Sequence, residues 1–126
     1  MCRSAGHPLA TAAALASLDT FEEEGLFQRA QELAPYFEQA VQSLRELPHV
    51  IDVRNMGLVA GIELEPRPGA PTARAFETFL KCYENGVLIR TTGDIIALSP
   101  PLIISKAQID ELIGKLGDAL REVGRN

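Results

Sequence analysis

The feature that most constrains this chain is an apolar helical segment near its N-terminus. Pro8 suits the first position of a helix, where its missing N–H is not needed, and residues 9–18 read LATAAALASL. Alanine is the strongest helix former. Because the segment is apolar on nearly all sides, we expect it to be buried on more than one side. A single small domain cannot readily cover such a helix, so the segment points to a neighbour outside the domain.

Three further helices are predicted from apolar residues that recur every three or four positions. They cover residues 26–44, residues 72–85 and the segment that follows the capping-box pattern from Ser105 to Gln108. Pro35 falls inside the first of them and predicts a kink or a restart near residues 31–35. On the helix over 72–85, one face carries most of the apolar side chains: Ala75, Phe76, Phe79, Leu80 and Tyr83.

Two hairpins are predicted between these helices. The first joins strands 50–54 and 58–64 through a turn at 55–57, and the second joins strands 87–90 and 95–98 through a turn at 91–94. Hairpins beside helices are typical of an α+β domain. We therefore predict a mainly antiparallel sheet of three or four strands packed against helices.

Composition excludes several classes of protein. The chain of 126 residues has room for one domain with a core, and its 12 Lys+Arg against 17 Asp+Glu leave a net charge of −5. This acidic balance argues against a nucleic-acid partner. There is no apolar run long enough for a membrane span, and the first residues lack the apolar region of a signal peptide. With only two cysteines, we expect a cytoplasmic protein.

The cysteines and histidines do not suggest chemistry of their own. Cys2, Cys82, His7 and His49 have no metal-ligand spacing, so we expect no metal site. Cys82 lies on a predicted helix beside its apolar face, which favours a buried and unreactive thiol.

Two places could bind an anionic group, although spacing alone leaves alternatives open. Arg90 ends a predicted strand and could hold a carboxylate with two hydrogen bonds, or it could be a surface arginine paired with Asp94 or solvent. Gly6 and His7 lead into a helix N-terminus, which can bind phosphate, or they could simply begin the helix. Arg54, beside the first turn, is ambiguous between the hairpin rim and the edge of an active site.

Four segments resemble the class III aminotransferases, the PLP-dependent ω-aminotransferases. Their sequences are GHPLATAAA (6–14), RNMGLVAGIEL (54–64), GVLIR (86–90) and LSPPLII (98–104). Their order and spacing agree with the family over residues 6–123. Residues 89–96, IRTTGDII, are most similar to the β-alanine:pyruvate aminotransferases.

The resemblance implies transfer of an amino group from an ω-amine or ω-amino acid to pyruvate or a similar keto acid, with PLP as the electron sink. It implies that residues 6–126 are the C-terminal small domain of fold type I, and that residues 1–5 are an atypical start or junction. Arg90 then matches the mobile arginine that binds the substrate carboxylate. Gly6 and His7 match the loop that approaches the cofactor phosphate across a dimer interface.

The same resemblance implies that essential parts lie outside this sequence. The family's Schiff-base lysine and the acidic residue at the pyridine nitrogen lie upstream of the matching segment, and Lys81, Lys106 and Lys115 lie outside the matching motifs. We therefore expect no catalytic residue, no PLP bound by the chain alone and no activity from it. The expected partners are a missing large domain, a second copy in a dimer or higher oligomer, and small amino and keto acids. The alternative is a stand-alone α+β module that binds a small ligand or dimerises without catalysis.

Overall fold

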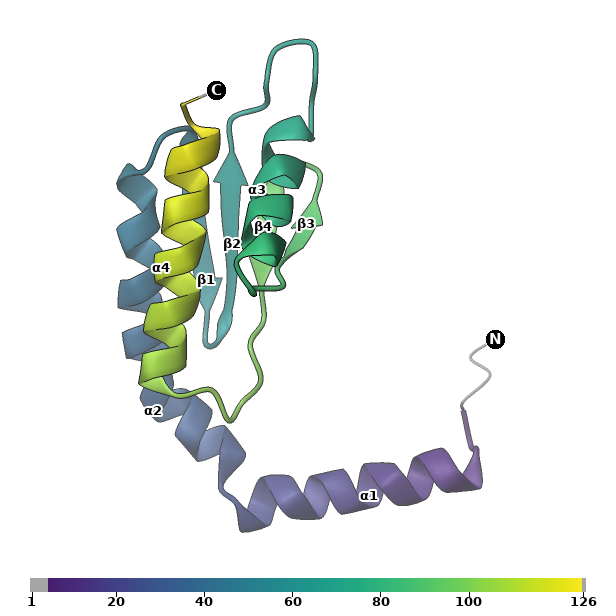
Figure 1. Cartoon of the computed structure of the whole chain (residues 1–126). Coiled ribbons are helices and arrows are strands. Elements are labelled where there is room, and N and C mark those ends of the chain that lie inside the picture. The colour runs from purple at the N-terminus through teal and green to yellow at the C-terminus, as the bar shows by residue number, and fades with distance from the viewer. Residues whose placement is uncertain (1–4, 126) are drawn as a thin grey trace.

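A four-stranded antiparallel sheet forms the centre of the computed structural model, which describes residues 5–125 (Figure 1). The strands follow the order β1-β2-β4-β3 and comprise β1 (Val50–Met56), β2 (Val59–Leu64), β3 (Arg90–Thr92) and β4 (Ile95–Leu98). This confirms the predicted α+β class and the antiparallel sheet. The predicted junction at residues 1–5 lies outside the described residues except for Ala5.

Both hairpins turn two residues later than predicted. β1 continues to Met56, so the turn consists of Gly57 and Leu58 rather than residues 55–57. β3 begins at Arg90, and the predicted turn residues Thr91 and Thr92 belong to the strand. Gly57 and Gly93 have φ values of 57° and 61°, a backbone conformation that glycine adopts at little cost. Strand pairing therefore continues until a glycine permits a tight turn.

The described residues also form four α-helices, and a short 3₁₀ helix (Ser43–Glu46) follows the second of them. Their bounds are α1 (Pro8–Glu23), α2 (Leu26–Gln42), α3 (Ala73–Glu84) and α4 (Lys106–Val123). The predicted capping box is present at α4. The Gln108 N–H donates to Ser105 Oγ at 3.2 Å, and the Ser105 N–H donates to Gln108 Oε1 at 2.9 Å. The apolar stripe predicted for α4 is buried except at Leu112, which is partly buried; its buried members are Ile109, Ile113, Leu116, Leu120 and Val123.

The helix α2 runs through Pro35 without a restart. Leu33, Phe37 and Val41 are buried along one side of this helix. Their packing holds the helix together across the backbone hydrogen bond that proline removes. The break in the chain comes earlier, at Gly25, whose φ of 59° separates α1 from α2.

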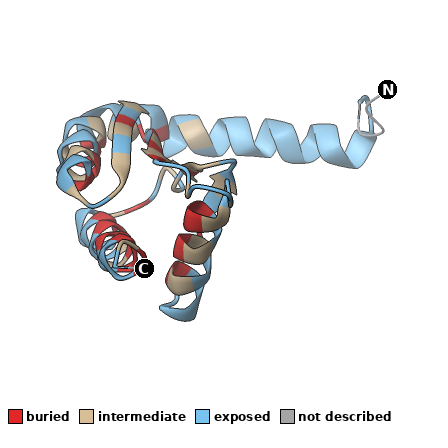
Figure 2. Ribbon diagram, turned by 90° about the horizontal axis from the view of Figure 1, so that it is seen from above, coloured by how far each residue is buried: buried red, intermediate tan, exposed pale blue. Residues whose placement is uncertain are grey.

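The helices cover only one face of the sheet. Helices α3 and α4 lie over it, and α2 packs against α4 beside the edge strand β1 (Figures 1 and 2). The buried strand side chains Val53, Ile62 and Ile96 point into this layer. Figure 2 shows burial confined to the sides of the elements that face one another.

The helix α3 corrects the predicted burial pattern. Phe76, Leu80 and Tyr83 belong to the predicted apolar face but are exposed. Ala75 is buried as predicted and Phe79 is partly buried, but the other buried side chains of α3 are Arg74, Thr78 and Cys82. Arg74 Nε donates to the Glu65 carbonyl at 2.9 Å, and Thr78 Oγ1 donates to the Arg74 carbonyl at 2.9 Å. Because their hydrogen bonds are satisfied, these polar groups tolerate burial.

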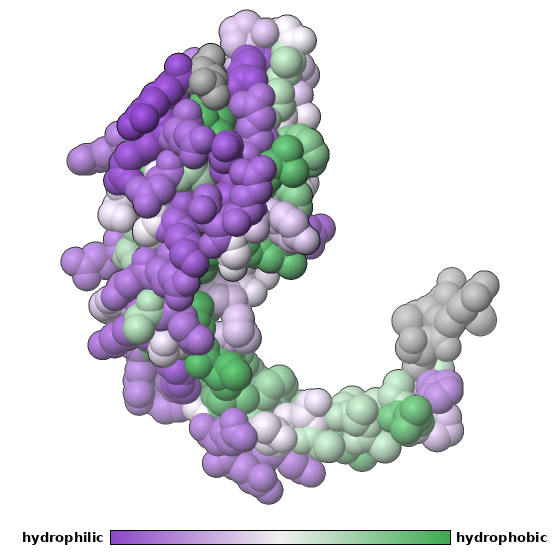
Figure 3. All heavy atoms as spheres, viewed as in Figure 1, coloured by the Kyte–Doolittle hydropathy of each residue, from purple (hydrophilic) through white to green (hydrophobic). Residues whose placement is uncertain are grey.

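The helix α1 projects from the rest of the chain, and none of its residues is buried (Figures 1 and 2). Leu9, Leu15 and Leu18 are 75%, 64% and 58% exposed, and Figure 3 shows a largely apolar surface along this helix. The predicted burial on several sides is therefore absent within residues 5–125. Across that same range, no helix combines the length and apolar character needed to cross a membrane.

The buried thiol of Cys82 leads to a first prediction. Its side chain is fully buried, and burial raises the pKa of the Cys82 thiol to about 11, so only about 0.1% is thiolate near pH 8. In a Cys2→Ser background, Cys82 should react with a disulfide reagent at least about a hundredfold more slowly in native buffer than in denaturing urea. Equal rates in the two conditions would contradict the burial of this thiol.

Candidate functional site

An apolar groove of about 670 Å³ opens between α3, the β3–β4 hairpin and the start of α4. Phe79, Leu88, Pro100 and Pro101 are among its lining residues. Among the described residues that line it, Arg90 is the only charged one. A mostly apolar pocket with one fixed charge suits a small ligand that has an apolar body and an anionic group.

Arg90 begins β3 at the edge of the sheet and is exposed. Within residues 5–125, no hydrogen bond or ion pair engages its guanidinium. The alternative pairing with Asp94 is not found, because Asp94 Oδ1 accepts a hydrogen bond from the Thr72 N–H at 2.8 Å. The Asp94 carbonyl also accepts from the Leu64 N–H at 2.8 Å. Asp94 is therefore a turn residue, and the donors of Arg90 are available for a carboxylate.

The wall of the groove that follows β4 is held in place from α2. The Arg29 guanidinium donates to the carbonyls of Leu102 and Ile104, the second at 2.6 Å. Hydrogen bonds from a charged donor to the backbone are stronger than neutral ones. This contact fastens the segment after Pro100 and Pro101, and it was not apparent from the sequence because residues 29 and 102 are far apart in the chain.

Gly6 and His7 lie far from this groove. Gly6 has a φ of 73°, and His7 is the residue before α1, where its side chain makes no capping hydrogen bond. Both are exposed. Because α1 carries them away from the sheet (Figure 1), the chain does not bring its two predicted binding regions together.

The three lysines do not converge on the groove. Lys81 pairs with Glu122 at 2.9 Å, Lys115 pairs with Glu111 at 2.6 Å, and Lys106 lies 5.0 Å from the centre of a tyrosine ring. Among the described residues, no lysine lines the groove that contains Arg90, and Lys106 instead lines a smaller pocket beside Arg29. Nor do residues 5–125 bring together three metal-ligating side chains of the His, Cys, Asp and Glu types.

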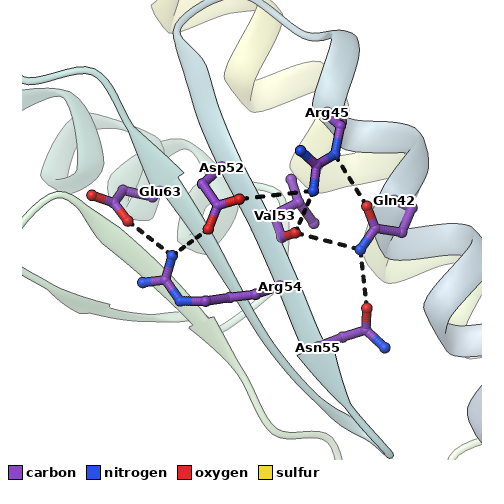
Figure 4. Close-up of polar contacts among 7 residues, drawn as sticks. All are labelled: Gln42, Arg45, Asp52, Val53, Arg54, Asn55 and Glu63. Carbon is purple, nitrogen blue, oxygen red and sulfur yellow. Dashed lines mark hydrogen bonds and ion pairs between the residues drawn. The ribbon is translucent and has the colours of Figure 1, made fainter.

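A second polar cluster lies on the two strands of the first hairpin (Figure 4). Arg54 Nη1 donates to Asp52 Oδ2 at 2.7 Å and to Glu63 Oε2 at 2.8 Å. The hydrogen bond from Arg54 holds the pKa of Asp52 below its ordinary value, and the hydrogen bonds that Arg54 donates to Glu63 and Asp52 raise the pKa of Arg54. The alternation of Asp52 and Arg54 on one strand was a signal for this pair. The position of Glu63 depends on the hairpin register.

Comparison with known proteins identifies the family. The family model described as "Aminotransferase class-III" matches residues 4–120. The chain is 59% identical over 117 residues to an omega-aminotransferase of Caulobacter vibrioides. It is 38% identical over 117 residues to the beta-alanine–pyruvate aminotransferase of Pseudomonas aeruginosa. Each match covers 93% of this chain.

Solved structures agree with this result. An aminotransferase from Vibrio fluvialis, described as a PMP-bound form, matches with a TM-score of 0.86 and 30% identity over 96% of this chain. A transaminase with L-alanine matches with a TM-score of 0.89 and 33% identity over 95% of the chain. The chain belongs to the class III aminotransferases, a PLP-dependent family. Within that family it is related to the ω-amino acid:pyruvate transaminases.

The chain corresponds to only part of these relatives. It spans 27% of the Caulobacter protein, 26% of the Pseudomonas protein and 28% of the Vibrio structure. These relatives therefore contain a much larger part that has no counterpart in the 126 residues. The uncovered helix α1 is consistent with such a neighbour.

The Arg54 cluster predicts a specific dependence on pH. Arg54→Met should raise the pKa of Asp52, because the Arg54 hydrogen bond is the main cause of its depression below 3.8. A carboxyl group whose pKa is lower in the folded chain than in the unfolded chain stabilises the fold at pH values above the unfolded-state pKa. This stabilisation is lost as the pH falls through the folded-state pKa. The variant should therefore unfold at lower urea than the parent near neutral pH, and the difference should shrink below pH 3.8.

The measurements are an NMR titration of the Asp52 carboxyl group and the urea midpoints of unfolding near neutral pH and below pH 3.8. Lys115→Met is the matched control, because it removes the partner of Glu111 on α4 and should leave Asp52 unchanged. An Asp52 pKa that is the same in the Arg54→Met variant and the parent would contradict the assignment.

Proposed function

We propose that residues 6–126 are the C-terminal small domain of an ω-amino acid or amine:pyruvate aminotransferase. The observation that carries this proposal is the unpaired Arg90, the only charged residue among the described residues lining an apolar groove. The names of the similar Caulobacter and Pseudomonas proteins support it. In the reaction, the donor loses its amino group to become a carbonyl compound, and pyruvate gains the group to become alanine. When bound to the whole enzyme, PLP carries the amino group and accepts electrons.

Arg90 binds the substrate carboxylate in this proposal. A guanidinium can hold a carboxylate with two parallel hydrogen bonds, and nothing within residues 5–125 competes for these donors. The apolar lining of Phe79, Leu88 and Pro100 accommodates the carbon chain. For an uncharged amine, the same guanidinium moves aside so that the groove accepts an apolar group.

Gly6 and His7 act at a different site, beside the cofactor phosphate bound to a second subunit. Their place before the N-terminus of α1 provides backbone N–H groups and a favourable helix dipole. Their separation from the groove of their own chain supports a role across a dimer interface.

The 126 residues alone should bind no PLP and catalyse no transamination. The catalytic lysine, the cofactor pocket and the larger domain belong to the part of the enzyme that the relatives have in addition. The apolar side of α1 packs against this larger domain or a second subunit. The cytoplasmic location remains a prediction from the two cysteines.

The second candidate is a stand-alone module that binds small acids through Arg90 or dimerises through α1. The free guanidinium in a groove favours the first form, and the exposed apolar helix favours the second. Calorimetry of the 126-residue chain with pyruvate and with β-alanine separates the candidates. Detectable binding of either compound supports the stand-alone module. The absence of a binding signal supports a domain that depends on the rest of an enzyme.

A chimera tests the proposed reaction directly. The matching segment of the Caulobacter omega-aminotransferase, 59% identical, is replaced by this chain, and alanine formation from pyruvate is measured with β-alanine or benzylamine as donor. The chimera should be active with β-alanine, and the 126-residue chain plus PLP should be inactive. Arg90→Ala should lower kcat/KM for β-alanine about 10- to 100-fold, the loss expected for a charged hydrogen-bonded pair. Its effect on benzylamine should stay within about threefold.

Arg121→Ala is the matched control, because Arg121 lies on α4 and pairs with Asp118. It should affect neither donor. The proposal is wrong if the chain alone forms alanine, or if Arg90→Ala lowers activity with both donors equally.

The exposed apolar helix predicts self-association of the isolated chain. Light scattering should show a mass that rises with concentration, because α1 presents Leu9, Leu15 and Leu18 to solvent. Leu15→Glu should shift the chain toward monomer, whereas Glu22→Gln at the polar end of α1 should not. A strict monomer at high concentration would contradict the role assigned to α1.

A further inference from the structure

The helix α3 presents an aromatic stripe to solvent. Phe76, Leu80 and Tyr83 follow one another at spacings of four and three residues, which places them on one side of a helix. They are 54%, 42% and 65% exposed. The ring of Phe79 lies beside them, with its centre 6.0 Å from that of Phe76 and 6.3 Å from that of Tyr83. These four residues form one continuous apolar surface, the α3 stripe.

The α3 stripe does not contribute to the core of the chain. The core side of α3 carries Ala75, Thr78 and Cys82, all buried, and Figure 2 shows burial confined to the sides of the elements that face one another. Of the stripe, Phe79 alone is partly buried, and it also lines the groove. The exposed part of the stripe amounts to about 300 Å² of apolar surface, a size at which a patch often marks an interaction site.

Charged side chains border the stripe on the side away from the groove. The 100° step of the helix places Glu77 and Lys81 together along this border. Arg67 donates two hydrogen bonds to the Glu77 carboxylate, at 2.5 and 2.8 Å. Lys81 pairs with Glu122 at 2.9 Å. An apolar centre beside a rim of charged residues is typical of a surface that binds another protein.

The α3 stripe is complementary to itself. A two-fold axis that crosses it between positions 79 and 80 makes the two copies of α3 antiparallel. Phe76 of one copy then lies opposite Tyr83 of the other, with Leu80 beside the axis. A two-fold contact repeats every such pair, so both aromatic ends of the stripe are covered at once.

The charges on the border match in the same arrangement. The two-fold axis keeps the two charged borders on the same side, and Lys81 of one copy lies level with Glu77 of the other to within about 1.5 Å along the helix axis. This pair of opposite charges also forms twice. Matched charges at the rim of an interface favour one orientation over the others. The stripe therefore fits a second copy of α3 in shape and in charge.

We propose that the α3 stripe binds the α3 stripe of a second copy of this chain in an antiparallel two-fold contact. The contact does not depend on the proposed function, and it is separate from α1, which projects away from the rest of the chain (Figure 1). A stripe of about 300 Å² is smaller than the ~800 Å² that each partner of a stable dimer buries, so two isolated chains associate weakly. A second contact through α1 reinforces it, because linked contacts add avidity.

The test is charge complementation at Leu80, measured by analytical ultracentrifugation of the 126-residue chain. All variants carry Leu15→Glu to weaken association through α1. Leu80→Glu and Leu80→Lys should each weaken the remaining self-association at least about tenfold, because like charges then meet at the two-fold axis. An equal mixture of the two variants should associate again as a mixed dimer. Met56→Glu and Met56→Lys are the matched controls, since Met56 is exposed on β1 and should change nothing.

Three outcomes would overturn the inference. The first is that Leu15→Glu alone gives a strict monomer at high concentration, which would mean that the stripe does not bind itself. The second is that the Leu80 variants associate as strongly as the Leu15→Glu parent. The third is that the mixture associates no more strongly than either variant alone, because Leu80 would then face a different surface, such as α1.

Thiol crosslinking tests the antiparallel direction. In a Cys2→Ser background, a chain with Phe76→Cys should crosslink to a chain with Tyr83→Cys faster than either crosslinks to itself, while the buried Cys82 stays unreactive. Faster crosslinking between identical variants would indicate parallel helices and contradict the proposed contact.

The chimera separates this inference from the proposed function. Leu80→Glu should lower the mass of the chimera in solution while kcat/KM for β-alanine stays within about threefold, because Leu80 does not line the groove. An unchanged mass would overturn the inference. If the parent chimera forms no alanine, the proposed function fails, and the measurements on the 126-residue chain still decide the contact.

Discussion

One-sided burial of the antiparallel sheet is the constraint on which the rest of the structure depends. Alternate strand residues such as Val53, Ile62 and Ile96 are buried beneath α3 and α4. The period of two in a strand then places every other residue on the opposite face, which no element of residues 5–125 covers. That uncovered face carries the arginines, and the exposed helix α1 adds a second uncovered surface (Figure 3). The chain thus has a complete core and incomplete outer surfaces.

The register of the two hairpins decides which residues lie side by side on the uncovered face of the sheet. Arg54, Gly61, Ala97 and Arg90 are far apart in sequence, but antiparallel pairing aligns them in one row. A slip of one residue would move each arginine to the helix-covered face, where an unpaired charge is costly. Packing of the core and placement of the charged groups are therefore the same constraint.

Local signals in the sequence predicted the elements that depend on nearest neighbours. The capping box at Ser105 and the stripe of α4 were correct, as was burial of Cys82. Predictions that needed the partner element were less accurate. Both hairpin turns were shifted, because strand length depends on the facing strand. The exposed face of α3 was not predicted correctly. Arg74 and Thr78 are polar but lie on its buried side, because their hydrogen bonds are satisfied there.

The sequence by itself determined the α+β class, the capped final helix and the resemblance that pointed to Arg90, because helix periodicity, capping and motif spacing are local properties. It also indicated that the apolar α1 needs a neighbour. Only the tertiary structure decided that Arg90 has no partner within residues 5–125, that it borders an apolar groove and that it shares a row with Arg54. These facts depend on strand register and on contacts between residues distant in the chain, such as Arg29 with Ile104, which local pattern does not specify.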